Sequence, residues 1–415
     1  MSLLIEGSQA VAEAVALCRP EVIAAYPISP QTHIVEQLSR KVKQGGMGCC
    51  QFLNVESEFA ALSVLIGASA SGARTYTATS SQGLLFMAEA VYNAAGLGLP
   101  IVMTIANRAV GAPINIWNDH SDSMALRDAG WIQLFAEDNQ EAVDLHIQAF
   151  HLAEELSCPV MACMDGFVLT HAYEPVELPS STQVDEYLPS FKPVQVLDPD
   201  DPASIGAMVG PEAFTEVKYL SHRQHLRALE LIPELTETFE QRFHRRSGGL
   251  CSPYRLEDAD IAVIALGSVI GTIKDAVDEL RREGMAVGCV KIGCYRPFPT
   301  LQLRALLAGV ARVIVVEKDL AVGGIVSADI QLALQGRQTP VHTVIAGLGG
   351  RSISKASLTQ MVRDARAERL SDPHFLGLNW TVINQELARR QETRRAGPMA
   401  EQLLRAVNAI GVKVV

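Results

Sequence analysis

Residues 1–172 alternate apolar runs with helical patterns, and this alternation constrains the fold more than any other feature. Apolar runs bounded by turn residues predict buried strands, at residues 21–28, 49–55, 74–80, 100–106, 131–136 and 159–164. The segments between them predict helices, at residues 7–18, 32–43, 57–71, 82–96 and 139–157. Asn139 is the expected cap of the last helix, with Glu141 in its first turn. Such alternation implies a doubly wound, mostly parallel sheet that helices cover on both faces.

A second α/β unit begins near Asp258 and extends to residue 370. Buried runs predict its strands, at residues 259–268, 286–299, 311–319 and 341–350. Between the two units, residues 173–257 are rich in proline and acidic clusters and form a connector, in which His222–Arg246 predicts a surface helix or an arm that grips a partner subunit. Residues 371–415 are polar, Arg-rich and helix-prone, and we expect a C-terminal helical tail.

Composition excludes several classes of function. The net charge is −11 over 415 residues, which argues against nucleic acid or an anionic membrane as a partner. The N-terminus lacks the basic region of a signal peptide, and no apolar stretch is long enough to cross a bilayer, so we expect a cytoplasmic protein. None of the eight cysteines forms a C-x-x-C pair. We expect reduced core cysteines and no metal site in this chain.

The segment Glu21–Thr32 is a buried strand that ends in the sequence Pro27-Ile28-Ser29-Pro30. Each proline fixes its own φ and keeps the preceding residue out of the helical region. This turn therefore holds the Ser29 hydroxyl in a defined place. An ordinary strand-to-helix turn with Ser29 as a cap is the alternative.

Two charged residues follow predicted strands. Glu58 and Glu56 both suit the first turn of a helix, where the dipole favours an acidic side chain, and spacing alone does not choose between them. Arg108 follows the apolar run PIVMTIAN, where a guanidinium can hold a carboxylate by two parallel bonds. A structural ion pair of Arg108 is the alternative, and its candidate partners are Asp119, Asp122 and Asp128.

Two polar loops complete the candidates. Ser80, Ser81 and Gln82 open a helix after the strand at 74–80, where hydroxyls and amides suit an anion or a polar ring, or simply cap the helix. The run from Asn115 to Asp122 offers Asp and His side chains but poor convergent geometry for a metal, so we expect a hydrogen-bonded loop on the substrate side or at an interface.

Five stretches in register resemble the alpha subunit of the 2-oxoacid:ferredoxin oxidoreductases. They are AAYPISPQT, NVESEFAA, TATSSQGLLFMAEAVYNAAG, the long stretch that begins ANRAVGAPINIWNDHSDS, and MDGFVLTH. The likeness is strong to about residue 170, is looser to about residue 370, and is greatest to the pyruvate-using members. It implies a thiamine-diphosphate pyrimidine-type domain over 1–172 and a transketolase C-terminal-like domain over 258–370.

The resemblance also implies roles for these residues. Glu58 matches the glutamate that activates the cofactor at N1′ of its aminopyrimidine, and a ring of Phe52, Leu53, Phe59 and Leu62 would partly desolvate it. Arg108 matches the arginine that holds the substrate carboxylate. Ser29 matches a position that is usually threonine and hydrogen-bonds the substrate. Further cofactor contacts are expected from Pro27, Ile28, Ser80, Ser81 and Gln82.

A missing motif completes the expectation. Thiamine diphosphate and its Mg²⁺ are normally held by a GDG motif, and this chain has only Asp165-Gly166. The diphosphate and Mg²⁺ are therefore expected on a beta subunit, and the iron–sulfur clusters on gamma and ferredoxin-like delta subunits or their equivalents. The implied reaction converts pyruvate and coenzyme A to acetyl-CoA and CO₂ and reduces ferredoxin. Three alternatives stay open: another 2-oxoacid, such as 2-oxoglutarate or a branched-chain acid; a cluster-free thiamine-dependent decarboxylase or dehydrogenase component; and a non-catalytic assembly subunit.

Overall fold

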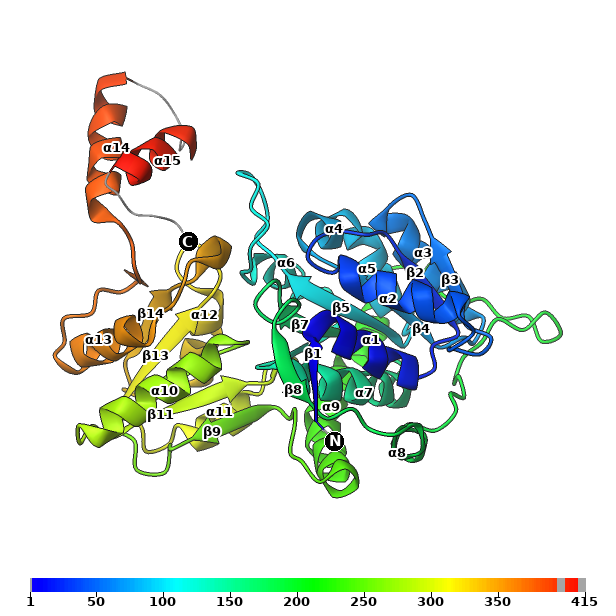
Figure 1. The fold of residues 1–415 in the computed structure, drawn as a ribbon. Helices are drawn as coiled ribbons and strands as arrows, with labels where there is room; N and C mark the ends of the chain where they lie inside the picture. The colour runs from blue at the N-terminus through cyan, green and yellow to red at the C-terminus, as the bar shows by residue number, and fades with distance from the viewer. Residues whose placement is uncertain (1, 394–399, 410–415) are drawn as a thin grey trace.

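The computed structural model describes residues 2–393 and 400–409, which form two large sheets, each covered by helices (Figure 1). The first sheet has seven strands in the order β12-β6-β7-β5-β4-β2-β3. Six of them come from the N-terminal region: β2 (Val22–Ala25), β3 (Gln51–Asn54), β4 (Thr75–Thr79), β5 (Ile101–Asn107), β6 (Ile132–Phe135) and β7 (Val160–Asp165). These six pair in parallel. The predicted strands and the mostly parallel sheet are confirmed.

Helices cover both faces of this sheet. They are α1 (Gly7–Leu17), α2 (Thr32–Lys43), α3 (Glu58–Ala70), α4 (Ser81–Phe86), α5 (Ala88–Gly96), α6 (Ser121–Ala125) and α7 (Asn139–Leu156). Side chains alternate across a strand, and β5 shows the result. Val102 packs in the core that contains α1 and α7, whereas Ile101 and Met103 pack in the core that contains α3 and α5.

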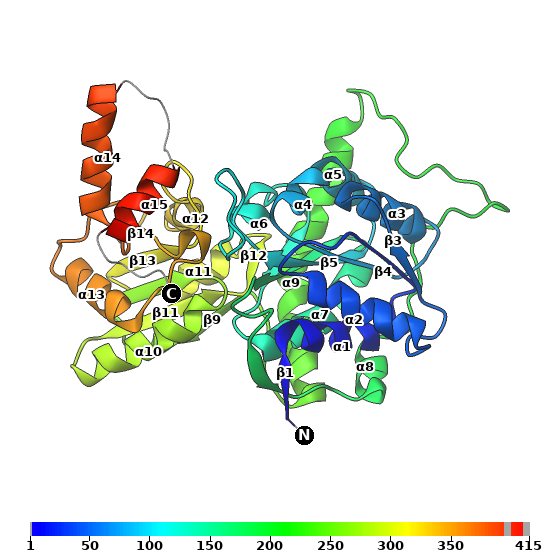
Figure 2. The same ribbon diagram turned by 45° about the horizontal axis from the view of Figure 1, so that its top comes forward.

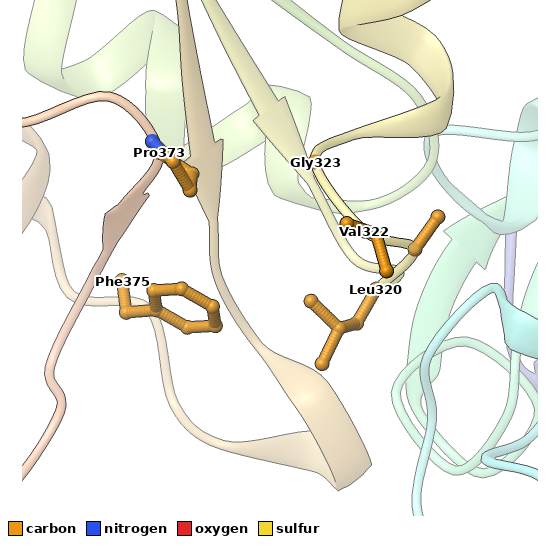
Figure 3. Close-up of a pocket in the computed structure, with 6 residues that line it drawn as sticks. Leu320, Val322, Gly323, Pro373 and Phe375 are labelled. Carbon is orange, nitrogen blue, oxygen red and sulfur yellow. The ribbon is translucent and has the colours of Figure 1, made fainter.

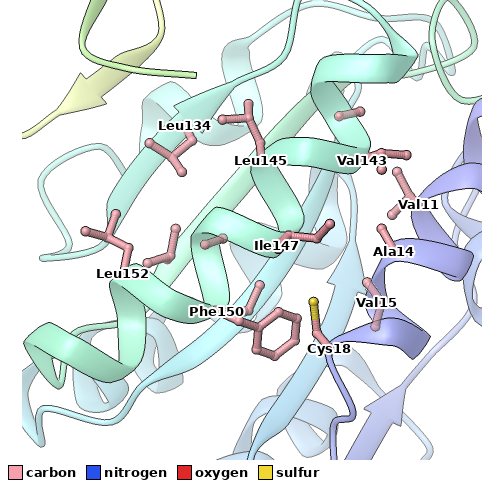
Figure 4. Close-up of a cluster of buried hydrophobic side chains, with 14 of the residues drawn as sticks. Val11, Ala14, Val15, Cys18, Leu134, Val143, Leu145, Ile147, Phe150 and Leu152 are labelled. Atoms are coloured by element: carbon pink, nitrogen blue, oxygen red, sulfur yellow. The ribbon is translucent and has the colours of Figure 1, made fainter. Parts of the chain in front are cut away.

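The α1–α7 side of the sheet forms a dense apolar core (Figure 4). Val11, Ala14 and Val15 of α1 pack with Val143, Ile147 and Phe150 of α7, and all are buried. The cap of α7 is Asp138 rather than the expected Asn139, because the Asp138 carboxylate accepts a hydrogen bond from the Glu141 N–H at 2.7 Å. The predicted helix at 82–96 is likewise two helices, since the backbone leaves the helical region at Met87.

The second unit holds a six-stranded sheet in the order β15-β14-β13-β10-β11-β9. Its strands are β9 (Cys251–Tyr254), β10 (Ile261–Ala265), β11 (Val287–Ile292), β13 (Arg312–Glu317), β14 (Val341–Ile345) and β15 (His374–Phe375). Only β9 runs antiparallel. The helices are α10 (Val269–Arg282), α11 (Thr300–Leu306), α12 (Ile325–Ala333) and α13 (Lys355–Arg366), with the short 3-10 turn η1 (Leu348–Gly350) after β14. Beyond them α14 (Trp380–Thr393) and α15 (Ala400–Ala409) project from this unit (Figure 2).

The two units share one sheet edge and one core. Strand β12 (Cys294–Arg296) leaves the second unit and pairs antiparallel with β6 of the first sheet. One continuous cluster of buried side chains includes Trp131 and Phe135 from the first unit and Ile264, Val290 and Tyr295 from the second. The sequence patterns place these residues in separate units, and only the folded chain joins them.

Sequence reasoning missed the pairs of short strands and placed the start of the connector helix too late in the chain. Strand β1 (Leu3–Glu6) pairs with β8 (Tyr173–Val176) in a two-stranded ribbon, and α8 (Ser181–Tyr187) follows it. The connector helix α9 (Phe214–Phe243) starts earlier than the expected His222 and has Pro233 inside it. Its C-terminal half packs on α7, while Tyr219 and Leu220 near its start stay exposed. Among the described residues, no helix is both long and apolar enough to cross a membrane.

The core contact between α1 and α7 yields a stability prediction. Phe150 is fully buried and stacks near Tyr76. Phe150→Ala should lower the free energy of unfolding by about 3–5 kcal/mol, because the change removes buried area and leaves a cavity. Chemical denaturation would measure the loss. Phe86→Ala is the matched control, since Phe86 is 61% exposed and its loss should change stability little. Equal effects of the two changes would contradict this assignment of the core.

Candidate functional site

Glu58 is the first residue of α3 and lies directly after the edge strand β3. The cap is Ser57, whose side chain accepts a hydrogen bond from the Ala60 N–H at 3.1 Å. This start turns the Glu58 side chain inward, so that the residue is only 7% exposed, whereas Glu56 is exposed to solvent. The structure therefore separates the two acidic residues that spacing could not distinguish.

The surroundings of Glu58 differ from the expected apolar ring. Leu62 is fully buried, but Leu53 is 41% exposed and Phe59 is 38% exposed, because β3 is the edge of the sheet. The Glu58 carboxylate instead lies against Gly83 of α4: a Cβ atom at Gly83 would meet Glu58 Oε1 at 2.5 Å and Thr79 Oγ1 at 2.7 Å. Only glycine leaves room for both oxygens at this place.

The two oxygens beside Gly83 have unused hydrogen-bonding capacity. Thr79 Oγ1 is buried and has no partner within the described part of the chain. The Glu58 carboxylate likewise has no hydrogen-bond or ion-pair partner among residues 2–393 and 400–409. Buried polar groups are normally satisfied. A polar ring that brings its own donors and acceptors would satisfy both oxygens.

The start of α4 is held to the end of β5 by two serine hydroxyls. Ser80 Oγ donates to the Ala106 carbonyl at 2.7 Å, and Ser81 Oγ donates to the Ala109 carbonyl at 2.6 Å. Both serines are fully buried, and neither hydroxyl caps the helix, so the capping alternative is wrong. The neighbouring Gln82 is partly exposed. Its carboxamide lies close to Gly111, because a Cβ atom on Gly111 would be only 2.8 Å from Gln82 Nε2.

Arg108 is buried without a carboxylate partner on its guanidinium. Nη1 donates to the Ser29 carbonyl at 2.9 Å, and Nε donates to the Asn115 carbonyl at 3.1 Å. Among the described residues no ion pair joins it to Asp119, Asp122 or Asp128, so the structural ion-pair alternative is wrong. Burial lowers the pKa of Arg108 and the nearby Asp122 charge opposes this, but an arginine keeps its charge in proteins. The structure thus leaves beside Ser29 a cation whose guanidinium has no ion-pair partner among the described residues.

The proline turn and Arg108 are brought together as one unit. Ser29 and Pro27 are exposed, Ile28 is half-buried and Pro30 is buried. Gly166 packs against this turn: a Cβ atom on Gly166 would lie 2.5 Å from the Asn107 carbonyl oxygen and 2.6 Å from Pro30 Cγ. Any side chain at position 166 would therefore displace the turn. The Ser29 hydroxyl therefore faces solvent on the same turn whose carbonyl holds Arg108.

Asp122 organises these loops, and sequence reasoning treated it only as one member of a polar run. Its buried carboxylate accepts hydrogen bonds from Asn107 Nδ2 at 2.8 Å and from the backbone N–H groups of Ser81, Arg108 and Ser123 at 2.9, 3.0 and 2.8 Å. Burial raises the pKa of Asp122 to about 6, and these donors oppose the rise. Asp122 thus ties the start of α4 to the end of β5. Its position inside an N-D-H-S-D run was the only signal available.

A second buried carboxylate, Asp165, joins the two units. It pairs with Lys318 Nζ and with His120 Nε2, both at 2.8 Å, and accepts the Ser268 N–H at 3.1 Å. Burial by itself raises the pKa of Asp165, but the Lys318 and His120 charges outweigh it and hold this pKa well below its ordinary range. The aspartate of the incomplete GDG motif is therefore fully engaged within the chain.

The same junction fixes the polar loop that holds Arg108. Gly349 N donates to Asp119 Oδ2 at 3.0 Å, and Asn115 Nδ2 donates to the Gly349 carbonyl at 3.2 Å. His120 N donates to the Lys318 carbonyl at 2.7 Å. The loop is hydrogen-bonded, as expected, and these contacts are with the second unit of the same chain.

An apolar pocket in the second unit is lined by none of the site residues described above. It is formed by the loop after β13, with Leu320, Val322 and Gly323, and by Pro373 and Phe375 at β15 (Figure 3). None of the sequence-predicted site residues lines it. It contains no charged or hydroxyl side chain, so it offers nothing for the chemistry of a carboxylate substrate.

Comparisons with known proteins agree with this geometry. A family model described as "Pyruvate flavodoxin/ferredoxin oxidoreductase, thiamine diP-bdg" matches residues 13–237, and one described as "Pyruvate:ferredoxin oxidoreductase core domain II" matches residues 259–358. Among curated proteins, the pyruvate synthase subunit PorA of Methanosarcina barkeri is 46% identical over 371 residues, which are 88% of this chain and 92% of the relative.

Two solved structures share the fold. One is a 2-oxoglutarate:ferredoxin oxidoreductase from Magnetococcus marinus with 2-oxoglutarate, coenzyme A and succinyl-CoA bound, with a TM-score of 0.66 and 20% identity. The match covers 88% of this chain and 65% of that one, so this chain spans less than two thirds of its length. The other is a split gene transketolase, an inactive beta4 tetramer, with a TM-score of 0.53 and 14% identity over 88% of this chain and 98% of that one. The expected fold class is confirmed.

The Asp165 cluster yields a prediction for stability and its pH dependence. Asp165→Asn should lower the free energy of unfolding by about 3–5 kcal/mol at neutral pH, because it leaves the Lys318 ammonium buried without its counter-ion. Since the folded pKa of Asp165 is depressed, its contribution is complete above about pH 4 and is lost as the pH falls further. Chemical denaturation at several pH values measures both effects.

The control for this prediction is a surface pair. Glu283→Gln removes a partner of Arg363 where both side chains are well exposed, and it should change stability little. The wild-type and Asp165→Asn stabilities should converge in acid. A constant difference between them down to pH 3 would contradict the ionised state of Asp165.

Proposed function

Because this chain belongs to the pyruvate flavodoxin/ferredoxin oxidoreductase family, we propose that it is the alpha subunit of a pyruvate:ferredoxin oxidoreductase. The reaction consumes pyruvate and coenzyme A, releases CO₂ and a proton, forms acetyl-CoA, and passes two electrons to ferredoxin; it is reversible. The observation that carries the proposal is a pair of buried charged groups without an ion-pair partner among the described residues: the carboxylate of Glu58 and the guanidinium of Arg108.

The residues around Glu58 fit the aminopyrimidine of thiamine diphosphate. Thr79 Oγ1 is buried without a partner among the described residues, and the Glu58 carboxylate beside it offers hydrogen-bond acceptors. Gly83 has no side chain and so lets both oxygens lie close together. When bound, thiamine diphosphate supplies a carbon nucleophile that attacks the 2-oxo group. Glu58 would share a proton with the ring at N1′.

Arg108 and Ser29 would bind the substrate. The Arg108 guanidinium is oriented by two carbonyl oxygens and keeps donors for the carboxylate of a 2-oxoacid. The exposed Ser29 hydroxyl, on the turn next to it, would donate to the same substrate. The charge of Arg108 orients the acid, and the buried surroundings strengthen the attraction.

The remaining cofactor contacts differ in kind. The hydroxyls of Ser80 and Ser81 already bond to carbonyls, so we assign these residues to backbone and packing contacts with the cofactor. The partly exposed carboxamide of Gln82 is free to donate through Nε2. Pro27 and Ile28 would contact the ring through their apolar surfaces.

The other half of the site would come from partner chains. We assign the diphosphate and Mg²⁺ to a beta subunit, since this chain has no GDG motif and its Asp165 is already paired. We assign the iron–sulfur clusters to gamma and delta subunits or their equivalents, with ferredoxin as the acceptor. In support, the described residues bring no three cysteines together, and seven of the eight cysteines are buried.

We also propose a division of the chain. Residues 1–172 form the pyrimidine domain, 173–257 the connector with a subunit-contact helix, 258–370 the transketolase C-terminal-like domain, and 371–415 a helical tail. The short strands β9 and β15 extend the sheet of the second domain beyond these bounds. Residues 394–399 and 410–415 of the tail lie outside the described residues. The matched families, which end at residue 237 and begin at residue 259, support the position of the second boundary. The exposed apolar residues near the start of α9, among them Tyr219 and Leu220, support a subunit contact there.

The role of Glu58 can be tested in the assembled complex. Glu58→Gln should lower kcat for pyruvate-dependent ferredoxin reduction by about 10²–10⁴-fold, because the amide cannot exchange the proton at N1′. Glu56→Gln is the matched control: it removes a carboxylate two residues away that is exposed to solvent, and it should leave turnover nearly unchanged. Near-normal turnover of Glu58→Gln would refute the proposed role and favour a non-catalytic assembly subunit.

The role of Arg108 predicts a change in KM. Arg108→Ala should raise the KM for pyruvate by roughly 30-fold or more while the KM for coenzyme A stays unchanged, because only the carboxylate loses its partner. Arg108→Lys should restore part of the affinity, since the charge returns without the planar fork. Profiling 2-oxoglutarate and branched-chain acids beside pyruvate identifies the substrate. An unchanged pyruvate KM in Arg108→Ala would sink the assignment.

A further inference from the structure

Three potential metal ligands meet where the N-terminal ribbon adjoins the start of α2, and none of them has a role in the proposed function. They are Glu6 at the end of β1, His33 in the first turn of α2, and His171 just before β8. Their ligating atoms all lie within 4.8 Å of one another. Among the described residues, no other three His, Cys, Asp or Glu side chains form such a group.

Backbone hydrogen bonds hold the segments that carry Glu6 and His171 next to each other. Glu6 pairs with Tyr173 in the ribbon of β1 and β8. Gly7 N donates to the Ala172 carbonyl at 3.0 Å, and both the N–H and the hydroxyl of Ser8 donate to the Thr170 carbonyl, at 2.9 and 2.8 Å. His171 is therefore clamped between two residues that bond to the segment carrying Glu6. Such preorganisation is what a metal site requires of its scaffold.

The side chains are oriented as ligands. His33 Nδ1 lies 2.6 Å from Glu6 Oε1, and the rings of His33 and His171 are tilted by 34° to each other, with centroids 4.8 Å apart. His171 Nδ1 is hydrogen-bonded to Thr170 Oγ1 at 2.8 Å, which leaves Nε2 as its free ring nitrogen. A hydrogen bond on one nitrogen that orients the other is the usual arrangement of a metal-bound histidine.

The burial of the group suits an accessible metal with an open position. The Glu6 side chain is 8% exposed, whereas the His33 side chain is 47% exposed. Two imidazoles and one carboxylate are the ligands of Zn²⁺ and other first-row divalent ions, whereas Mg²⁺ and Ca²⁺ prefer oxygen alone. We propose that Glu6, His33 and His171 form a Zn²⁺-type site, in which water completes the coordination.

The site has a structural consequence for the chain. Helix α2 begins directly after the turn that contains Ser29 and Pro30, and His33 is its second residue. A metal bound here would join the β1–β8 ribbon to the first turn of α2. It would therefore stabilise the Ser29–Pro30 turn that precedes this helix. This inference does not depend on the proposed function, because the three ligands take no part in the assigned chemistry.

Metal binding is tested with the full-length chain, purified on a tag without histidines, stripped with a chelator and titrated with ZnCl₂. Calorimetry and elemental analysis after dialysis should give one zinc per chain, and bound zinc should raise Tm. His33→Ala and His171→Ala should each weaken binding by at least about tenfold. His222→Ala is the matched control, since His222 is exposed on α9 outside the group, and it should bind zinc as the wild type does.

A spectroscopic measurement on the wild type removes the dependence on variants. Co²⁺ in place of zinc should give the visible d–d absorption of a four- or five-coordinate ion, and Glu6→Gln should shift or abolish that spectrum. Far-UV circular dichroism shows whether each variant is folded. Absence of stoichiometric zinc in the wild type, or full zinc retention in folded His33→Ala and His171→Ala, would overturn the proposal in favour of a Glu6–His33 ion pair with a stacked histidine.

Discussion

The buried ionic cluster around Asp165 is the interaction on which the rest of this structure depends. Asp165 is the last residue of β7 in the first sheet, whereas Lys318 and Ser268 follow β13 and β10 in the second. A carboxylate and an ammonium that both leave water cost several kcal/mol unless each finds its partner. The carboxyl edges of the two parallel sheets must therefore face each other. Strand β12, which pairs with the first sheet, and the shared apolar core stabilise the same arrangement of the two units.

The candidate site is built at this junction because loops after parallel strands gather there. The second unit holds the loop of Asn115 and Asp119, and that loop in turn orients Arg108. Asp122 fixes the opposite side by binding the backbone of α4 and β5. Two buried carboxylates are thus fully satisfied and serve the scaffold. The side chains of Glu58 and Arg108 are buried without an ion pair in the described part of the chain, and this contrast is what marks them as groups that await a ligand.

Sequence reasoning located the elements well where periodicity was strong. The buried runs predict strands within a few residues of those observed, and local patterns also locate the first turn of α3, the rigid turn at Ser29 and the cation at Arg108. Sequence reasoning failed where the structure of a segment depends on contacts with residues distant in the chain. The pairs β1–β8 and β6–β12, the apolar ring expected around Glu58, and the engagement of Asp165 with Lys318 depend on such partners.

The sequence by itself determined the α/β class, the order of the strands along the chain and the residue types available for chemistry, because hydrophobic periodicity and proline geometry act over a few neighbouring residues. Only the tertiary structure decided which charges are compensated. It buried Glu58 and exposed Glu56. It kept the Arg108 guanidinium out of an ion pair with its candidate aspartates, although the Arg108 backbone bonds to Asp122, and it brought Glu6, His33 and His171 together. Burial and Coulomb pairing depend on distances in space, and spacing along the chain does not contain those distances.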